Sequence, residues 1–141
     1  MTSAVTTIAN PPQVPRYVFG TGGISSPTPI HHALSTGYLA FDTAQQYDNE
    51  SEIGSAIRTY PHKIDRSDLF IITKINQPGS TVEETLEGIR ESVEKIGLGG
   101  YVDLFLIHNP NYGPDGRRIQ WEALEQAKKM GLARAIGVSN L

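Results

Sequence analysis

Cysteine is absent from this chain of 141 residues, so neither a disulfide framework nor a metal site with thiolate ligands is possible. No apolar run approaches the roughly 20 residues that a membrane-spanning helix needs. Lysine and arginine are scattered and the formal net charge is −3, so there is no basic stripe for nucleic acid or anionic lipid. Residues 1–15 lack the hydrophobic stretch of a secretory signal. We therefore expect a cytoplasmic protein with no nucleic acid, membrane or metal among its partners.

Apolar residues make up 38% of the chain, which is enough to bury one core of ordinary size. Residues 1–16 are polar and contain proline, and they precede the first apolar run. We expect one folded domain that spans residues 17–141, preceded by this polar N-terminal segment.

Five short apolar runs recur along the domain and predict buried strands. They occupy residues 17–20, 37–44, 69–75, 101–108 and 133–140. Helical patterns lie between them, and a chain that alternates strand with helix forms a parallel sheet through right-handed crossovers. The predicted fold class is therefore α/β, a parallel (β/α) barrel type with about five strands and four helices.

The clearest helical pattern covers residues 80–97. Its apolar residues follow at intervals of four and three and so share one helix face: Val82, Leu86, Ile89, Val93 and Ile96. Ser80 with Glu83 predicts a capping box at the start, and Gly97 predicts the end.

Three further helices are expected. Asn49 with Glu52 offers a capped start for one helix, and a weaker helix covers residues 29–36. The pattern over residues 117–131 is expected to bury Trp121, Leu124 and Ala127.

Polar side chains end four of the predicted strands at nearly constant spacing. Asp42, Lys74, His108 and Asn140 are separated by 32, 34 and 32 residues. One strand-helix unit takes about 30 residues, so these positions are equivalent in successive units. They lie at the carboxyl ends of the strands, where the active sites of (β/α) barrels form.

Each of these side chains, taken alone, also suits a structural role. Packing does not require titratable groups at one position of three successive units, however, and Tyr47 follows Asp42 by only five residues. A tyrosine alone holds its proton tightly at neutral pH, and a nearby ammonium makes donation easier because it favours the phenolate. A histidine can donate a hydrogen bond to a carbonyl oxygen and so polarise it. Together these side chains predict a proton donor beside a polarised carbonyl. A nicotinamide cofactor would have to supply the hydride.

The segments "GYLAFDTAQQYDNESEIGSAIR", "DLFIITKI", "YVDLFLIHNP" and "GLARAIGVSNL" resemble, in order and spacing, the signatures of the aldo-keto reductase family. The resemblance implies reduction of an aldehyde or ketone to an alcohol on a TIM barrel. It implies that Tyr47 is the proton donor and that Lys74, paired with Asp42, assists it. His108 resembles the residue that orients the substrate carbonyl.

The same resemblance implies a cofactor site. Ser139 and Asn140 resemble the pair that binds the nicotinamide carboxamide, while Gly20, Thr21 and Asp42 match residues beside the cofactor. The resemblance favours NADP(H) over NAD(H), with a small carbonyl compound as substrate.

The chain also departs from the family pattern. Gly22 and Gly23 stand where family members often carry a large aromatic residue that walls the substrate pocket. A full barrel takes about 250 residues, so residues 17–141 are expected to form only its N-terminal half. Such a half would expose strand edges and favour self-association.

Three other interpretations remain open. The segment "GTGGIS", with Asp42 about 20 residues further on, partly matches a dinucleotide-binding fingerprint, although Ser25 takes the place of the last glycine. Lys74 could form a Schiff base in a barrel aldolase, which leaves Tyr47 unexplained. The chain could also be a catalytically silent half-barrel that serves as an interaction module.

Overall fold

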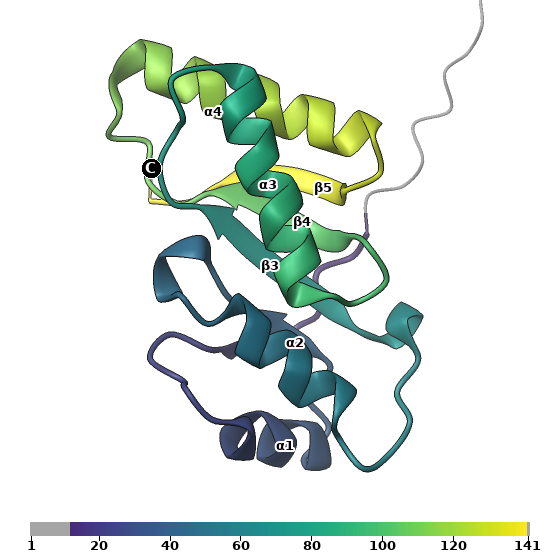
Figure 1. Ribbon diagram of the computed structural model, residues 1–141. Coiled ribbons are helices and arrows are strands. Elements are labelled where there is room, and N and C mark those ends of the chain that lie inside the picture. Colours follow the sequence, from purple (N-terminus) through teal and green to yellow (C-terminus); the bar gives the residue numbers. More distant parts are fainter. Residues whose placement is uncertain (1–11, 141) are drawn as a thin grey trace, which may run out of the picture.

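The computed structural model describes residues 12–140, so the first eleven residues of the polar segment expected over residues 1–16 lie outside the described part. Figure 1 shows the arrangement of the elements. The strands are β1 (Phe19–Gly20), β2 (Ala40–Asp42), β3 (Phe70–Ile75), β4 (Val102–Ile107) and β5 (Ala133–Val138). The helices are α1 (Pro27–Ser35), α2 (Glu50–Arg58), α3 (Val82–Ile96) and α4 (Gly113–Lys129), with short 3₁₀ turns η1 (Gln45–Tyr47) and η2 (Arg66–Asp68).

The five strands form one sheet in the order β1-β2-β3-β4-β5, and every neighbouring pair is parallel. Each helix contacts the next along the chain, and Figure 1 shows α2 and α3 in front of the strands that they cover. This is the predicted α/β architecture with five strands and four helices, so the fold prediction is confirmed.

The two faces of the sheet have different surroundings. The larger core joins the helices to one face and includes Ile71 and Ile75 of β3. Phe70 and Ile72 alternate with them and form a smaller apolar cluster with Ala40 of β2. Because side chains alternate across a strand, Lys74 belongs to the face of this smaller cluster.

The cap of α3 differs from the predicted one by a single position. Thr81 is the N-cap, and its hydroxyl accepts a hydrogen bond from the Glu84 backbone N–H at 3.1 Å. The Glu84 carboxylate accepts from the Ser80 backbone N–H at 2.7 Å, which completes a reciprocal pair of the capping-box kind. The predicted Ser80–Glu83 pair was wrong, whereas Gly97 ends the helix as expected, with φ of 60°.

Two other details of the helices also differ from the expectations. Asn49 precedes α2 without capping it, because its side chain turns inward to other backbone groups. Trp121 is 39% exposed, so its predicted burial was wrong, whereas Leu124 and Ala127 of the same helix are fully buried. The helix expected over residues 29–36 begins earlier, at Pro27, because proline suits the first turn of a helix.

A buried carboxylate joins the strands at the end of the sheet opposite to the predicted site. Asp103, 1% exposed, accepts hydrogen bonds from Arg66 at 2.9 Å, from Arg134 at 3.0 Å and from the Ile71 backbone N–H at 2.9 Å. These contacts fix β3, β4 and β5 relative to one another, which in turn fixes where their other ends lie. Within residues 12–140, no helix has the length and apolar character to cross a membrane.

Candidate active site

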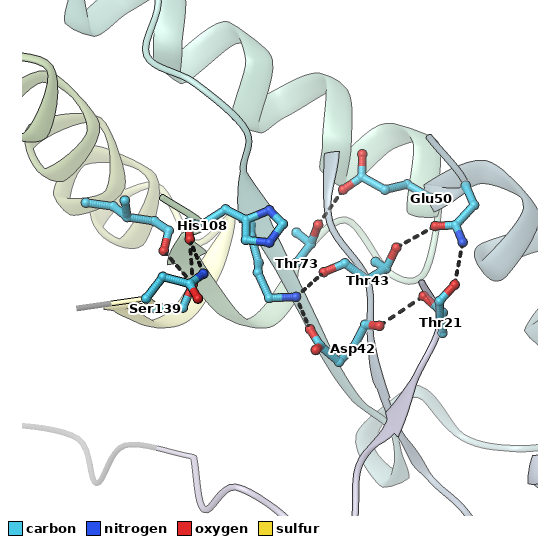
Figure 2. Close-up of polar contacts among 11 residues, drawn as sticks. Thr21, Asp42, Thr43, Glu50, Thr73, His108 and Ser139 are labelled. Atoms are coloured by element: carbon cyan, nitrogen blue, oxygen red, sulfur yellow. Dashed lines mark hydrogen bonds and ion pairs between the residues drawn. The ribbon is translucent and has the colours of Figure 1, made fainter. Parts of the chain in front are cut away.

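The carboxyl ends of four adjacent strands bring the predicted side chains to one edge of the sheet (Figure 2). Asp42 is the last residue of β2 and Lys74 is the penultimate residue of β3. His108 directly follows β4, and Asn140 follows β5 by two positions. Their constant spacing in the sequence therefore corresponds to equivalent places on neighbouring strands.

Lys74 and Asp42 form an ion pair between β3 and β2, drawn as a dashed line in Figure 2. The lysine side chain is 8% exposed, and its Nζ also donates to the backbone carbonyl of Thr43 at 2.8 Å. A buried ammonium needs such partners, because leaving it unpaired away from water is costly. Lys74 is thus held in one orientation at the strand end.

Tyr47 closes the short turn η1 and lies above this ion pair. The Lys74 ammonium is 5.1 Å from the centroid of the phenol ring. The imidazole of His108 stands edge-to-face with the same ring, with the two centroids 5.7 Å apart and the planes at 89°. Asp48, the next residue, has φ of 51° and turns the chain from η1 toward α2. The structure thus brings Tyr47, Lys74, Asp42 and His108 together.

The environment of His108 keeps its imidazole neutral at neutral pH. Burial is the main cause that lowers the pKa of His108, the charge of Lys74 lowers it further, and the charge of Asp42 acts in the opposite direction. Its buried Nδ1 has no hydrogen-bond partner within residues 12–140. A neutral imidazole retains one N–H donor, which is what a carbonyl oxygen requires.

Ser139 and Asn140 lie beside the carbonyl group of His108. The Ser139 hydroxyl donates to the backbone oxygens of Ile107 at 3.0 Å and of His108 at 2.9 Å. The Asn140 amide donates to the same His108 oxygen at 2.7 Å, and the residue itself is exposed. These bonds hold an exposed amide group at the edge where the other predicted residues meet.

The two predicted cofactor residues at the carboxyl end of β1, Gly20 and the following Thr21, differ in accessibility. Gly20 is exposed, and a Cβ built on it would meet no atom within 4 Å. Thr21 is fully buried, and both its backbone N–H and its hydroxyl donate to the carbonyl of Asp42. Thr21 therefore supports the strand end that carries Asp42, and its side chain does not face the open edge.

Comparison with known proteins identifies the family of this chain. The family model described as "Aldo/keto reductase family" matches residues 25–141. The chain belongs to the aldo/keto reductase family. The suspected resemblance is thereby confirmed.

Two curated relatives and one solved structure illustrate how this aldo/keto reductase chain is related to others. It is 37% identical to morphine 6-dehydrogenase of Pseudomonas putida, over 87% of this chain and 40% of the relative. It is 42% identical to methylglyoxal reductase DkgB of Salmonella typhi, over 79% of this chain and 41% of the relative. An aldo-keto reductase of Bombyx mori, solved in complex with NADP, aligns with a TM-score of 0.74 and 29% identity, over 89% of this chain and 46% of that one. The chain thus spans about two fifths of the length of these two relatives.

Two polar side chains behind the site are buried, which the sequence did not predict. Asn49 and Glu50 are each 4% exposed, although Asn49 was expected to cap a helix. Glu50 accepts a hydrogen bond from the hydroxyl of Thr73 on β3, drawn in Figure 2. Nothing in the sequence pattern distinguishes these buried residues from an ordinary polar helix start.

Other features of the described residues bear on ligands. No group of three or more histidine, cysteine, aspartate or glutamate side chains suitable for a metal ion occurs in the part of the chain that the structure describes. An open cavity of about 550 Å³, lined in part by Tyr17, Tyr38 and Leu39, lies toward the amino ends of β1 and β2. This cavity lies at the amino ends of the strands, whereas Tyr47 lies at their carboxyl ends. The cavity is therefore separate from the candidate site.

Proposed function

We propose that this aldo/keto reductase chain reduces an aldehyde or ketone to an alcohol at the carboxyl ends of its strands, with Tyr47 as proton donor. The observation that carries the proposal is the joint placement of three groups around one phenol ring. The Lys74 ammonium lies 5.1 Å from the ring centroid, paired with Asp42, and the His108 ring stands edge-to-face against it at 5.7 Å.

The proton step follows from the charges around Tyr47. Donation leaves negative charge on the phenolic oxygen, and a nearby ammonium stabilises that charge. Asp42 orients the Lys74 ammonium through the ion pair, and the Thr43 carbonyl accepts a second hydrogen bond from it. Because both partners are held by the sheet, little reorganisation is needed when the proton moves.

His108 would orient the carbonyl group that receives this proton. Its lowered pKa keeps it neutral at neutral pH, so it donates a hydrogen bond without releasing its own proton. Tyr47 and His108 would then both donate hydrogen bonds to the same substrate oxygen. That arrangement stabilises the oxygen as it gains negative charge and leaves proton transfer to Tyr47.

We further propose that a nicotinamide cofactor binds at this edge, NADP(H) in preference to NAD(H). When bound, the nicotinamide supplies the hydride. The residues fit its carboxamide group, because the exposed Asn140 amide beside the Ser139 hydroxyl offers both donors and acceptors. The preference for NADP(H) is supported by the relative from Bombyx mori, which was solved with NADP.

The chain beside Tyr47 has no side chain at Gly22, which bears on access to the phenol. A Cβ built on Gly22 would lie 3.7 Å from Cζ of the Tyr47 ring, so a larger side chain there would cover the phenol. Glycine leaves this side open. Methylglyoxal is a reasonable first substrate, because one relative is a methylglyoxal reductase.

The test combines cofactor binding with turnover by the 141-residue polypeptide. NADPH fluorescence is titrated first, and NADPH oxidation is then followed at several pH values with methylglyoxal and with a bulkier aromatic aldehyde. We expect binding and aldehyde-dependent oxidation that Tyr47→Phe abolishes. If NADPH neither binds nor is oxidised, the reductase proposal is wrong for this polypeptide, and an interaction module becomes the better interpretation.

A further inference from the structure

Gln45, at the start of the turn that carries Tyr47, connects this turn to two other elements. Its Nε2 donates to the carbonyl of Gly88 at 3.1 Å and to the hydroxyl of Ser92 at 3.0 Å, both on α3. Its Oε1 accepts from the backbone N–H of Asn76 at 2.9 Å, directly after β3. One side chain thus joins the turn to α3 and to the end of the strand that presents Lys74.

Asn49 holds the other end of the same turn. Its Nδ2 donates to the carbonyls of Thr21 at 2.8 Å and Ile24 at 2.9 Å, and its Oδ1 accepts from the Thr43 hydroxyl at 2.8 Å. The amide therefore uses both donors and its acceptor on the chain that follows β1 and β2. Thr43 is also the residue whose carbonyl binds the Lys74 ammonium.

The residues between these two anchors have a different environment. Gln46 and Asp48 are exposed, whereas Gln45 and Asn49 turn inward on either side of Tyr47. The backbone of the turn makes only short-range bonds, from Tyr47 N–H to Ala44 at 3.0 Å and from Asp48 N–H to Gln45 at 3.2 Å. A single 3₁₀ turn is weak by itself. Within residues 12–140, the two inward amides therefore make the long-range hydrogen bonds that hold this turn.

We propose that Gln45 and Asn49 are positioning residues that hold the Tyr47 hydroxyl in place relative to Lys74 and His108. The inference rests on the proposed reductase function for its kinetic part only. Misplacing a reacting group by 1 Å can lower the rate about 100-fold. Without the Gln45 amide, the turn still carries Tyr47 but loses the hydrogen bond from the Asn76 N–H that ties it to the end of β3, the strand of Lys74.

The test compares the same substitution at two adjacent glutamines. Gln45→Met keeps the side-chain length and removes all three hydrogen bonds, while Gln46→Met makes the identical change at an exposed position of the same turn. The ring signals of Tyr47 are followed by NMR in protein with labelled tyrosine and are assigned through their loss in Tyr47→Phe. Because the His108 ring stands edge-to-face against Tyr47, the chemical shifts of these signals depend on where the Tyr47 ring lies. They therefore report the position of Tyr47 independently of turnover.

We expect Gln45→Met to move the Tyr47 signals, to leave those of the other five tyrosines in place, and to lower kcat by about 10- to 100-fold with little change in KM. Gln46→Met should change none of these. The positioning role is wrong if the Tyr47 signals are the same in Gln45→Met as in Gln46→Met. It is also wrong if Gln45→Met moves these signals without lowering kcat.

A further variant, Ser92→Ala, covers the case in which Gln45→Met fails to fold. Ser92→Ala removes one bond of Gln45 and leaves the other two, so a smaller displacement of the same Tyr47 signals is expected. An unchanged Tyr47 signal in folded Ser92→Ala, together with an unfolded Gln45→Met, would also overturn the proposal. A wild-type protein that oxidises no NADPH refutes the reductase function, whereas the NMR comparison still decides whether Gln45 positions Tyr47.

Discussion

The rings of Tyr47 and His108 stand at 89° to each other with their centroids 5.7 Å apart, although 61 residues separate them along the chain. Tyr47 comes from the turn after β2 and His108 from the end of β4. Between them on the sheet lies β3, which supplies the Lys74 ammonium 5.1 Å from the Tyr47 ring. A ligand oxygen placed against the phenol would thus also meet a donor that follows a different strand.

Replacing Tyr47 by phenylalanine should lower kcat by about 100- to 10,000-fold, the usual contribution of a general acid. The affinity for NADPH should stay within the error of the wild-type value, because the proposed role of the hydroxyl is on the substrate oxygen and not on the cofactor. Stopped-flow reduction of methylglyoxal and a fluorescence titration measure the two quantities on one preparation. Near-normal turnover by Tyr47→Phe would show that another group donates the proton.

The pKa of His108 should respond in opposite directions to two neighbouring substitutions. Burial and then the Lys74 charge lower it, whereas the Asp42 charge raises it. Lys74→Met should therefore raise the His108 pKa toward the ordinary value of about 6.5, and Asp42→Asn should lower it further. NMR titration of the imidazole signals measures both changes. A shift of the same sign in the two variants would contradict the assignment of these charges.

Glu50 should make the stability of the protein depend on pH in an unusual direction. Burial is the largest effect on its pKa and raises it, despite hydrogen bonds from Thr73 and Ser92 and the charge of Lys95, which lower it. The folded state therefore holds the proton more tightly than the unfolded state. As pH rises from about 4.3 through the higher folded-state pKa, this contribution to stability is lost.

Glu50→Gln should remove that loss, because an amide oxygen can still accept from Thr73 and carries no charge. Glu52→Gln is the matched control, since Glu52 is exposed on the same helix. Urea unfolding between pH 4 and 8 gives the free energy of unfolding for each protein. At neutral pH we expect the free energy of unfolding to be higher for Glu50→Gln than for the wild type. The two free energies should approach each other as the pH falls. A variant that is less stable than wild type throughout would contradict the expectation.

The parallel α/β class and the end of the sheet that carries Asp42, Lys74 and His108 could be predicted from the sequence. Apolar runs recur once per strand-helix unit, and a parallel sheet places every strand end on the same side. The prediction needed no knowledge of individual contacts, because the repeat alone fixes which residues are equivalent.

Details that depend on tertiary contacts were not predictable in this way. Asn49 has the residue type and place of a helix cap, but the buried carbonyls of Thr21 and Ile24 bind its amide instead. Trp121 continues an apolar helix face, yet α4 packs through smaller residues and leaves the indole 39% exposed. In both cases local pattern and tertiary environment favour different outcomes, and the environment decides.

The contact between α2 and α3 should tolerate no side chain at Gly54. A Cβ built there would overlap the carbonyl oxygen of Ile96 and lie 2.7 Å from its carbonyl carbon. This is backbone that cannot rotate away, and Arg58 of α2 also donates to the same Ile96 oxygen at 2.7 Å. Gly54→Ala therefore has to push the two helices apart, at a cost of about 3 kcal/mol or more.

Gly88 provides the matched control, because it is also a glycine within a helix but has room for a methyl group. Its added Cβ would meet only the Gln45 amide nitrogen, at 3.8 Å, which is an ordinary contact. Gly88→Ala should therefore stabilise the protein by about 0.5–1 kcal/mol through helix propensity. Thermal and urea unfolding of the two variants measure the difference. Equal stabilities would mean that α2 and α3 are not packed as closely as Gly54 and Ile96 indicate, and that the turn carrying Tyr47 rests on a looser support.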